Sequence, residues 1–163
     1  MKLFQGAVRQ WLLLVFAIVG AGVAIYITTV HYAQVPLFCS AQGVVNCERV
    51  TSSSYSVVPG TALPITIPGL AWFAISAGLA IGGIRSSQRW IRGAELAWTI
   101  LGMLTVFYLL YVELVILHTI CLWCTAVHVL IFGSLLVAIV DYVLSGQRWE
   151  QAAEDSAVGV QEG

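Results

Sequence analysis

Residues 11–30 read WLLLVFAIVGAGVAIYITTV, an uninterrupted run without a charged side chain. A helix of about 20 apolar residues is long enough to cross the roughly 30 Å hydrocarbon core of a bilayer. Three further apolar stretches of similar length follow, at about 64–84, 94–117 and 119–144. Backbone amides that face lipid must be hydrogen-bonded within the protein, which excludes open sheets. The sequence therefore predicts an all-α integral membrane protein, a bundle of four transmembrane helices.

The first apolar run could instead be a cleaved signal peptide, because Lys2 and Arg9 precede it. It is longer than a typical signal core, however, and no clean Ala-x-Ala cleavage site follows it. Its loss would also leave three spans, with one face of the bundle uncovered. We therefore expect residues 11–30 to form the first span of the mature protein.

The composition agrees with a membrane protein. Of 163 residues, 60% are hydrophobic and 9% are charged, and the mean hydropathy is +0.92, whereas soluble domains carry about 25% charged residues. A formal net charge of −1 provides no basic face for phosphates, so we expect no nucleic-acid partner. We expect one domain over residues 1–144, with an outer loop at 31–63. The polar, acidic residues 145–163 are expected to form a disordered cytoplasmic tail without a catalytic role.

The distribution of lysine and arginine predicts the orientation of the bundle, because these residues favour cytoplasmic loops. They lie before the first span, between the second and third, and after the fourth: Lys2, Arg9, Arg85, Arg89, Arg92 and Arg148. The loop at 31–63 contains only Arg49, and the connection near Leu117 contains neither lysine nor arginine. We therefore expect both termini to be cytoplasmic and these two connections to face outward.

Four cysteines are the strongest indication of function. Cys121 and Cys124 form a Cys-x-x-Cys pair at the start of the fourth span, and Cys39 and Cys47 lie in the outer loop. The predicted topology places all four on the outer, oxidising side, where disulfides persist. In a Cys-x-x-Cys pair one thiol stabilises the thiolate of the other and can resolve a mixed disulfide. A second cysteine pair within reach of this one predicts a relay that moves electrons between thiols and another acceptor.

Helical spacing extends this prediction. Cys121, Cys124 and His128 would share one helix face, with the cysteines at the helix N-terminus, where unpaired N–H groups favour a thiolate. The helix below the pair is apolar, which suits a hydrophobic electron acceptor from the bilayer. A lone histidine such as His128 can equally be a satisfied interior group. Glu113, near the outer end of the third span, is interpreted as reaching the interface or pairing locally, without a catalytic role.

Other roles for the cysteines remain open at this stage. Four cysteines can bind structural zinc, although the spacing from Cys39 to Cys47 lacks the short knuckle usual for such sites. Two outward-facing pairs could also be static disulfides that staple the loop of a non-catalytic membrane scaffold. Inert buried thiols would not explain why all four lie on one side.

The ordered combination of motifs resembles the vitamin K epoxide reductase family, in its bacterial members. The resemblance extends to about Leu144 and rests on four motifs: Cys39-x7-Cys47, NCERVTSS at 46–53, Leu63-Pro64-x4-Gly69, and HTICLWC at 118–124. In the related quinone-coupled DsbB type, the Cys-x-x-Cys pair comes early, in the first outer loop. Here it comes last, which favours the vitamin K epoxide reductase family.

The resemblance implies a role for each cysteine. Cys39 would form the mixed disulfide with a protein substrate, and Cys47 would shuttle electrons from Cys39 to Cys121. Cys121 would be the resolving partner of Cys124, the thiol that reacts with a quinone. The resemblance also implies quinone-binding residues: Val50, Ser53, Tyr55 and His128. His128 stands where vertebrate members carry tyrosine.

The function implied by the resemblance is that of a membrane thiol:quinone oxidoreductase without a metal. It would reoxidise a separate thioredoxin-like (DsbA-like) protein, since the chain ends soon after the fourth span, where many bacterial members carry a fused thioredoxin-like domain. Electrons would pass through the two cysteine pairs to menaquinone or ubiquinone in the bacterial inner (plasma) membrane, supporting disulfide bond formation. Thr66, rather than an amide side chain, opens the second span and favours quinone reduction over its alternative, vitamin K epoxide reduction.

Overall fold

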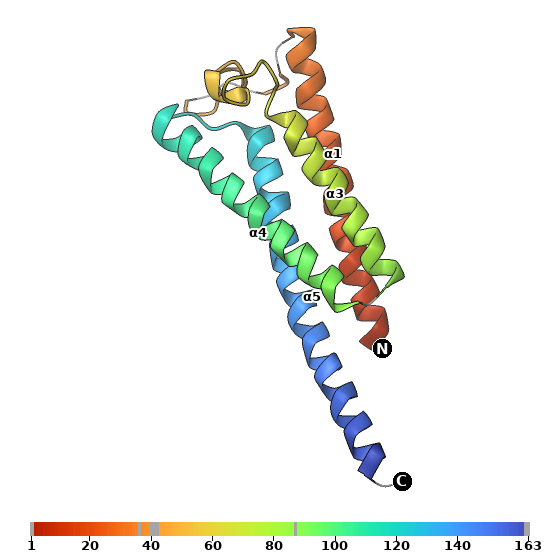
Figure 1. The fold of residues 1–163 in the computed structure, drawn as a ribbon. Helices are drawn as coiled ribbons and strands as arrows, with labels where there is room; N and C mark the ends of the chain where they lie inside the picture. Colours follow the sequence, from red (N-terminus) through yellow and green to blue (C-terminus); the bar gives the residue numbers. More distant parts are fainter. Residues whose placement is uncertain (1, 36, 40–42, 87, 162–163) are drawn as a thin grey trace.

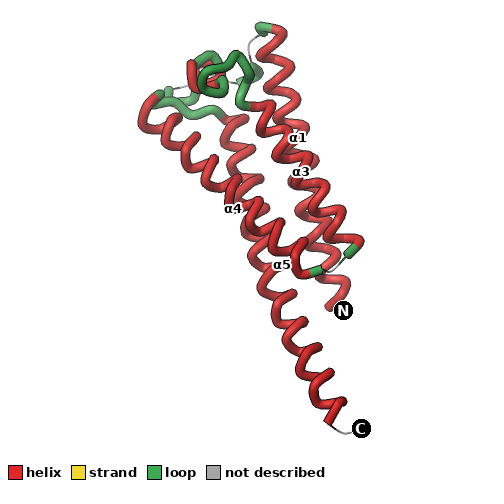
Figure 2. Tube along the Cα trace, viewed as in Figure 1, coloured by secondary structure: helices red, strands yellow, loops and turns green. Residues whose placement is uncertain are grey.

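The computed structural model describes residues 2–35, 37–39, 43–86 and 88–161, and it is helical along most of this length (Figure 1). Within these residues, the helices long and apolar enough to cross a membrane are α1 (Lys2–Ala33), α3 (Thr66–Arg85), α4 (Arg89–Tyr111) with the π-helical turn η2 (Val112–Ile116), and α5 (Leu122–Gln161). Between α1 and α3 lie the short helix α2 (Cys47–Thr51) and the 3-10 turn η1 (Ser54–Ser56). Figure 2 shows helices and loops, and no strand in the part of the chain described. The predicted class, an all-α bundle with four membrane spans, is confirmed.

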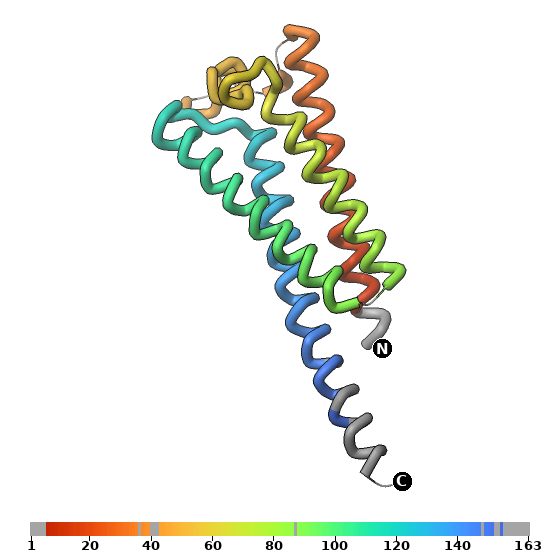
Figure 3. The backbone as a smooth tube through the Cα atoms, viewed as in Figure 1, coloured from red at the N-terminus to blue at the C-terminus, as the bar shows by residue number. Residues whose placement is uncertain are grey.

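The helices place both cysteine-bearing segments at one end of the bundle. α1 packs against α3 and α5, and α4 packs against α5 (Figure 3). The connection with α2 and η1 lies at the same end as the turn between η2 and α5, and both chain ends lie at the opposite end (Figure 1). Segments that are far apart in the sequence therefore meet where the predicted relay requires them to meet.

The first and last helices, α1 and α5, are longer than the predicted spans. α1 passes both ends of residues 11–30, and α5 continues to Gln161, through the segment predicted to be a disordered tail. Lengthening an existing helix requires no new nucleation, and the alanines and glutamates of this segment favour helix. α5 begins at Leu122 rather than at Thr119, because the chain turns at His118, whose φ is 49°. The predicted loop and tail also include positions outside the described residues: 36, 40–42, 162 and 163.

Close packing of the helices depends on two glycines. Gly20 of α1 lies against the ring of Phe73 of α3, and Gly102 of α4 lies against the indole of Trp72. A Cβ atom at either glycine would overlap the facing ring, so a larger residue would push the helices apart. Small residues of this kind let membrane helices approach closely.

A buried polar cluster joins α1, α4 and α5 towards the end that carries the termini. Asp141 accepts hydrogen bonds from Arg9 Nε at 2.7 Å, from Gln10 Nε2 at 3.0 Å and from Arg92 Nη1. Gln10 Nε2 also donates to Glu95 Oε2 at 2.9 Å. Asp141 is 1% exposed and Arg92 is 4% exposed. Charges are retained inside a bundle when they are paired in this way, so the cluster locks these helices together.

We predict that Asp141→Ala destabilises the bundle, because it leaves two arginines without their shared carboxylate. Removing one partner of a buried ion pair costs about 3–5 kcal/mol. Thermal unfolding of the purified protein in detergent should therefore show a clearly lower midpoint than for the wild type. Glu154→Ala removes an exposed carboxylate from the same helix and serves as the matched control. Equal midpoints for both variants and the wild type would contradict a locking role for the cluster.

Candidate functional site

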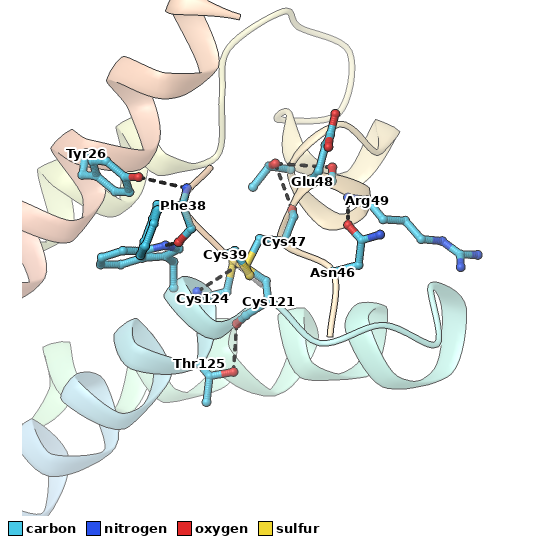
Figure 4. The surroundings of a disulfide bond; sticks show 12 residues. Tyr26, Phe38, Cys39, Asn46, Cys47, Glu48, Arg49, Cys121, Cys124 and Thr125 are labelled. Carbon is cyan, nitrogen blue, oxygen red and sulfur yellow. Dashed lines mark hydrogen bonds between the residues drawn. A yellow bond between two sulfur atoms is a disulfide. The ribbon is translucent and has the colours of Figure 1, made fainter. Parts of the chain in front are cut away.

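The loop cysteines form a disulfide beside the Cys-x-x-Cys pair. Cys39 and Cys47 are bonded, with their Cα atoms 6.1 Å apart. Cys47 begins α2, whose N-terminus is capped by the side-chain oxygen of Asn46. Cys121 and Cys124 carry free thiols next to this disulfide (Figure 4). The structure thus places an oxidised outer pair next to a reduced inner pair.

A backbone bridge sets the register between the two pairs. The N–H of Asn46 donates to the carbonyl of Ile120 at 3.1 Å, and the N–H of Ile120 donates to the carbonyl of Val44 at 2.9 Å. Cys47 follows Asn46 directly and Cys121 follows Ile120 directly. Both cysteines are fully buried, at 1% and 0% exposure. The bridge therefore holds the more buried cysteine of one pair, Cys47, next to the more buried cysteine of the other, Cys121.

An aromatic pair holds the segment just before Cys39. Trp123, inside the Cys-x-x-Cys motif, packs on Tyr26 with ring centroids 4.8 Å apart. Trp123 Nε1 donates to the carbonyl of Phe38 at 3.0 Å, and the Tyr26 hydroxyl accepts from the Phe38 N–H at 3.2 Å. Trp123 thus attaches the outer cysteine segment to the start of α5.

Cys121 precedes α5 and caps it, which corrects the prediction that both cysteines lie on the helix. The Cys121 sulfur accepts a hydrogen bond from the Cys124 N–H at 3.3 Å, and the Cys121 carbonyl accepts from the Thr125 N–H at 2.9 Å. This is the N-cap arrangement, in which a side chain satisfies a free N–H of the first turn. The hydrogen bond with the Cys124 thiol lowers the pKa of Cys121 below its usual range, and the helix N–H groups act in the same direction. Burial opposes the shift.

The hydrogen bond between Cys124 and Cys121 leads to a testable prediction about the pH at which Cys121 ionises. In Cys124→Ser the hydroxyl can still donate to Cys121, whereas in Cys124→Ala nothing replaces the thiol. With the loop disulfide intact, Cys121 is the only free cysteine in either variant. Since the donor stabilises the thiolate, Cys121 should remain ionised to a lower pH in the serine variant than in the alanine variant. Ultraviolet thiolate absorbance as a function of pH measures this, and coincident titration curves would contradict it.

A small cavity lies below the cysteines and collects the residues predicted to bind a quinone. Its volume is about 70 Å³. Its lining includes Cys124 together with the predicted set: Val50, Ser53, Tyr55 and His128. Ser53 Oγ is already engaged, because it donates to the Val50 carbonyl at 2.7 Å. Residues of the outer loop and of α5 thus line the same cavity, next to Cys124.

A larger apolar cavity of about 430 Å³ continues from the small one between α3, α4 and α5. The two cavities share lining residues, among them Cys124 and His128. Trp72 and Trp98 also line the larger cavity. Their rings stack with centroids 6.3 Å apart, and each indole N–H donates to the backbone carbonyl of the other. This pair joins α3 to α4 where the two helices approach, and Figure 1 shows them diverging towards the loop end.

Two buried polar atoms at the cavity have no hydrogen-bond partner among the described residues. They are His128 Nδ1 and Glu113 Oε2, on side chains with 6% and 3% exposure. Glu113 lies in η2 at the end of α4, lines the small cavity together with Cys124, and interacts with the Cys124 thiol and the Cys121 backbone. Sequence reasoning assigned Glu113 no role beyond a local or interfacial contact. One feature of the sequence does indicate a functional role for Glu113. It is an acidic residue within an apolar span, where a charge is costly and is usually retained for function.

Comparison with protein families decides the identity of the chain. The model of the vitamin K epoxide reductase family matches residues 11–139, which include all four cysteines and most of each of the four spans. The chain belongs to the vitamin K epoxide reductase family. No curated protein sequence matches it closely. This vitamin K epoxide reductase homologue is therefore a multi-pass membrane oxidoreductase of the quinone or vitamin K epoxide reductase type.

Proposed function

We propose that this vitamin K epoxide reductase homologue is a thiol:quinone oxidoreductase that reoxidises a thioredoxin-like protein. The observation that carries the proposal is the order of burial along the four cysteines. Cys39 is partly exposed, Cys47 and Cys121 are fully buried against each other, and Cys124 lines a cavity. Reactive sulfurs are thus accessible at the two ends of the series and shielded in the middle. A purely structural loop disulfide would not explain why a second cysteine pair lies between that disulfide and a cavity.

The cavities suit a quinone as the second substrate. A quinone has two carbonyl oxygens on an apolar ring and a long apolar tail. The small cavity offers the unpartnered Nδ1 of His128, which can donate a hydrogen bond to a carbonyl when it carries the ring proton. The larger apolar cavity would receive the rest of the ring and the start of the tail. Val50, Ser53 and Tyr55 would cover the ring from the loop side.

The electron path follows from thiol–disulfide exchange. The partner's dithiol reduces the disulfide Cys39–Cys47, beginning with attack on Cys39, the accessible sulfur. The Cys47 thiolate then attacks Cys121 of the oxidised inner pair, and Cys39 resolves the mixed disulfide by attacking Cys47. Cys121 leaves as a thiolate, and its lowered pKa makes it a better leaving group. The net result is a reformed loop disulfide and a reduced inner pair, the state seen in the structure.

The final step transfers two electrons to the quinone. The thiols of Cys121 and Cys124 lose two protons and two electrons and form a disulfide, while the two quinone carbonyls become hydroxyls. We infer that this happens at the extracytoplasmic face of a bacterial plasma membrane. The asymmetry of arginine supports this orientation: the end of α3 and the start of α4, which contain Arg85, Arg89 and Arg92, lie at the end of the bundle opposite the outer loop (Figure 1).

Reduction of a vitamin K epoxide is the second candidate, because the same inner dithiol could reduce it. Thr66 lines both cavities, and its hydroxyl accepts from Thr28 Oγ1 at 2.6 Å. No amide side chain from the start of α3 reaches the described cavity lining. This favours the quinone, whose reduction needs fewer polar contacts.

A turnover assay tests the proposal. The purified protein is mixed with a quinone and a reduced thioredoxin-like protein, and the quinone absorbance and the donor thiols are followed together. We expect one quinone reduced for each donor disulfide formed, at a rate proportional to the protein concentration. A non-catalytic scaffold would leave the quinone spectrum and the donor thiols unchanged, and that result would overturn the proposal.

A further inference from the structure

The buried acidic residues of α4 and its π-helical turn have very different surroundings. Glu95 lies in the polar cluster with Arg92, whose Nη1 is 3.8 Å from Glu95 Oε2. Glu113 lies among the residues of the small cavity, whose described lining contains neither lysine nor arginine. A buried carboxylate is normally retained because a cation neutralises it. Glu95 therefore has a structural explanation, and Glu113 does not.

The local backbone directs Glu113 towards the thiols. η2 is a π-helical turn, in which the Leu117 N–H donates to the Val112 carbonyl at 2.9 Å. Turns of this kind add a residue to a helix and are frequent at functional sites. Here the turn places Glu113 at the small cavity that Cys124 also lines, where its carboxyl group interacts with the Cys124 thiol and the Cys121 backbone. Its Oε2 atom is buried without a partner at the cavity.

We propose that Glu113 is the catalytic base for the inner cysteine pair, accepting the proton of Cys124 and delivering it to the quinone substrate. The inference rests on the proposed function and names a residue that carries one of its protons. The Cys124 S–H bond breaks, its proton passes to the Glu113 carboxylate and then to a carbonyl oxygen of the quinone. The two thiols supply two electrons as the Cys121–Cys124 bond forms, and the Cys121 proton completes the second hydroxyl.

The neighbours of Glu113 agree with this role. The other titratable groups that line the cavity are Cys124 and His128 on α5, His31 on α1, and Tyr55 on η1. Cys124 is the only one of them that interacts with the carboxyl group, and its one thiol proton can be directed either to Glu113 or to the Cys121 sulfur. A base beside the thiol avoids moving the proton through water, which an apolar cavity would exclude. Positioned bases typically contribute about 100- to 10,000-fold in rate.

The test compares Glu113→Gln with Glu95→Gln, a matched change of a buried glutamate in the same membrane span. For Glu113→Gln we expect quinone reduction to slow at least about 100-fold at neutral pH. The deficit should narrow as pH rises, because hydroxide then removes the thiol proton without help. Glu113→Asp, which keeps a carboxylate, should recover part of the rate. Glu95→Gln should retain the wild-type pH profile.

A second readout needs no quinone. In Cys121→Ala protein with the loop disulfide intact, Cys124 is the only free thiol. Its S–H stretching band in the infrared should lie at a lower frequency than that of a free thiol, because it donates to a carboxylate. Adding Glu113→Gln should shift the band upward, and adding Glu95→Gln should leave it unchanged.

The outcomes separate this inference from the proposed function. An active wild type with a Glu113→Gln variant of equal rate, equal pH profile and unshifted S–H band would overturn the role of Glu113 alone. A loss of rate that is independent of pH and not recovered by Glu113→Asp would also overturn it, since a merely structural role gives that result. A wild type that reduces no quinone would overturn the proposed function as well.

Discussion

Cys124→Ala should reduce quinone reduction to the uncatalysed background, with any electron donor. Cys124 is the cysteine that lines both cavities, so no other sulfur can deliver electrons to a quinone bound there. Its loss also leaves Cys121 without a partner for a disulfide. The measurement is the rate of quinone bleaching, with a reduced thioredoxin-like protein or with a small membrane-permeant dithiol. A variant that keeps a substantial rate with either donor would contradict the assignment of Cys124.

Cys39→Ala is the comparison that shows whether the loop pair is a relay. It should block reduction by the protein donor, because the partly exposed sulfur that meets the partner is gone. The small dithiol should still support reduction, since it can reach Cys124 through the apolar cavity. If Cys39→Ala lost both activities equally, the loop disulfide would be a structural staple.

Cys47→Ala should trap the protein partner in a covalent complex. The Cys39 thiol of the reduced variant attacks a partner that keeps only its reactive cysteine, activated as a mixed disulfide with a small thiol, and the small thiol leaves. Because neither Cys47 nor a second partner thiol is present to attack the new bond, a stable Cys39 adduct should accumulate as a large fraction of the protein. It is detected as a slower band on a non-reducing gel that disappears when a reductant is added.

The matched control for this capture is the double variant Cys39→Ala with Cys47→Ala, which lacks both loop thiols and should capture nothing. A Cys47→Ala protein that forms no adduct while its Cys39 thiol reacts with an alkylating reagent would reverse or remove the proposed order. Capture by the double variant would show that another cysteine meets the partner.

Much of the fold could be predicted from the sequence because the bilayer leaves few choices. Residues 11–30 contain no charge, and a segment of that kind has to be a helix in lipid. The even number of spans then brings residues 31–63 and the start of α5 to the same end of the bundle. The cavity residues Val50, Ser53, Tyr55 and His128 came from the resemblance to a family rather than from spacing. The structure brings them together with Cys124, and their contact with a quinone stays a prediction.

The features that could not be predicted depend on contacts between distant segments. The bridge between residues 44–46 and Ile120 consists of backbone groups, which no side-chain pattern reveals. Cys121 caps α5 because the chain turns at His118, and a helix boundary is difficult to place to within three residues. Glu113 was expected to be an interfacial residue because the sequence predicts a regular α-helix at this position. The π-helical turn could not be predicted, and it places the Glu113 side chain at the cavity that Cys124 lines.

The most direct test of the relay is a count of electrons in a single turnover without a donor. The fully reduced protein has four thiols, which hold electrons for two quinones, since each disulfide formed reduces one. Under anaerobic conditions we expect two quinones reduced per wild-type protein, and one for the double variant Cys39→Ala with Cys47→Ala. One quinone per wild-type protein would show that the loop pair is disconnected from the inner pair. No reduction at all would contradict the thiol:quinone reaction itself.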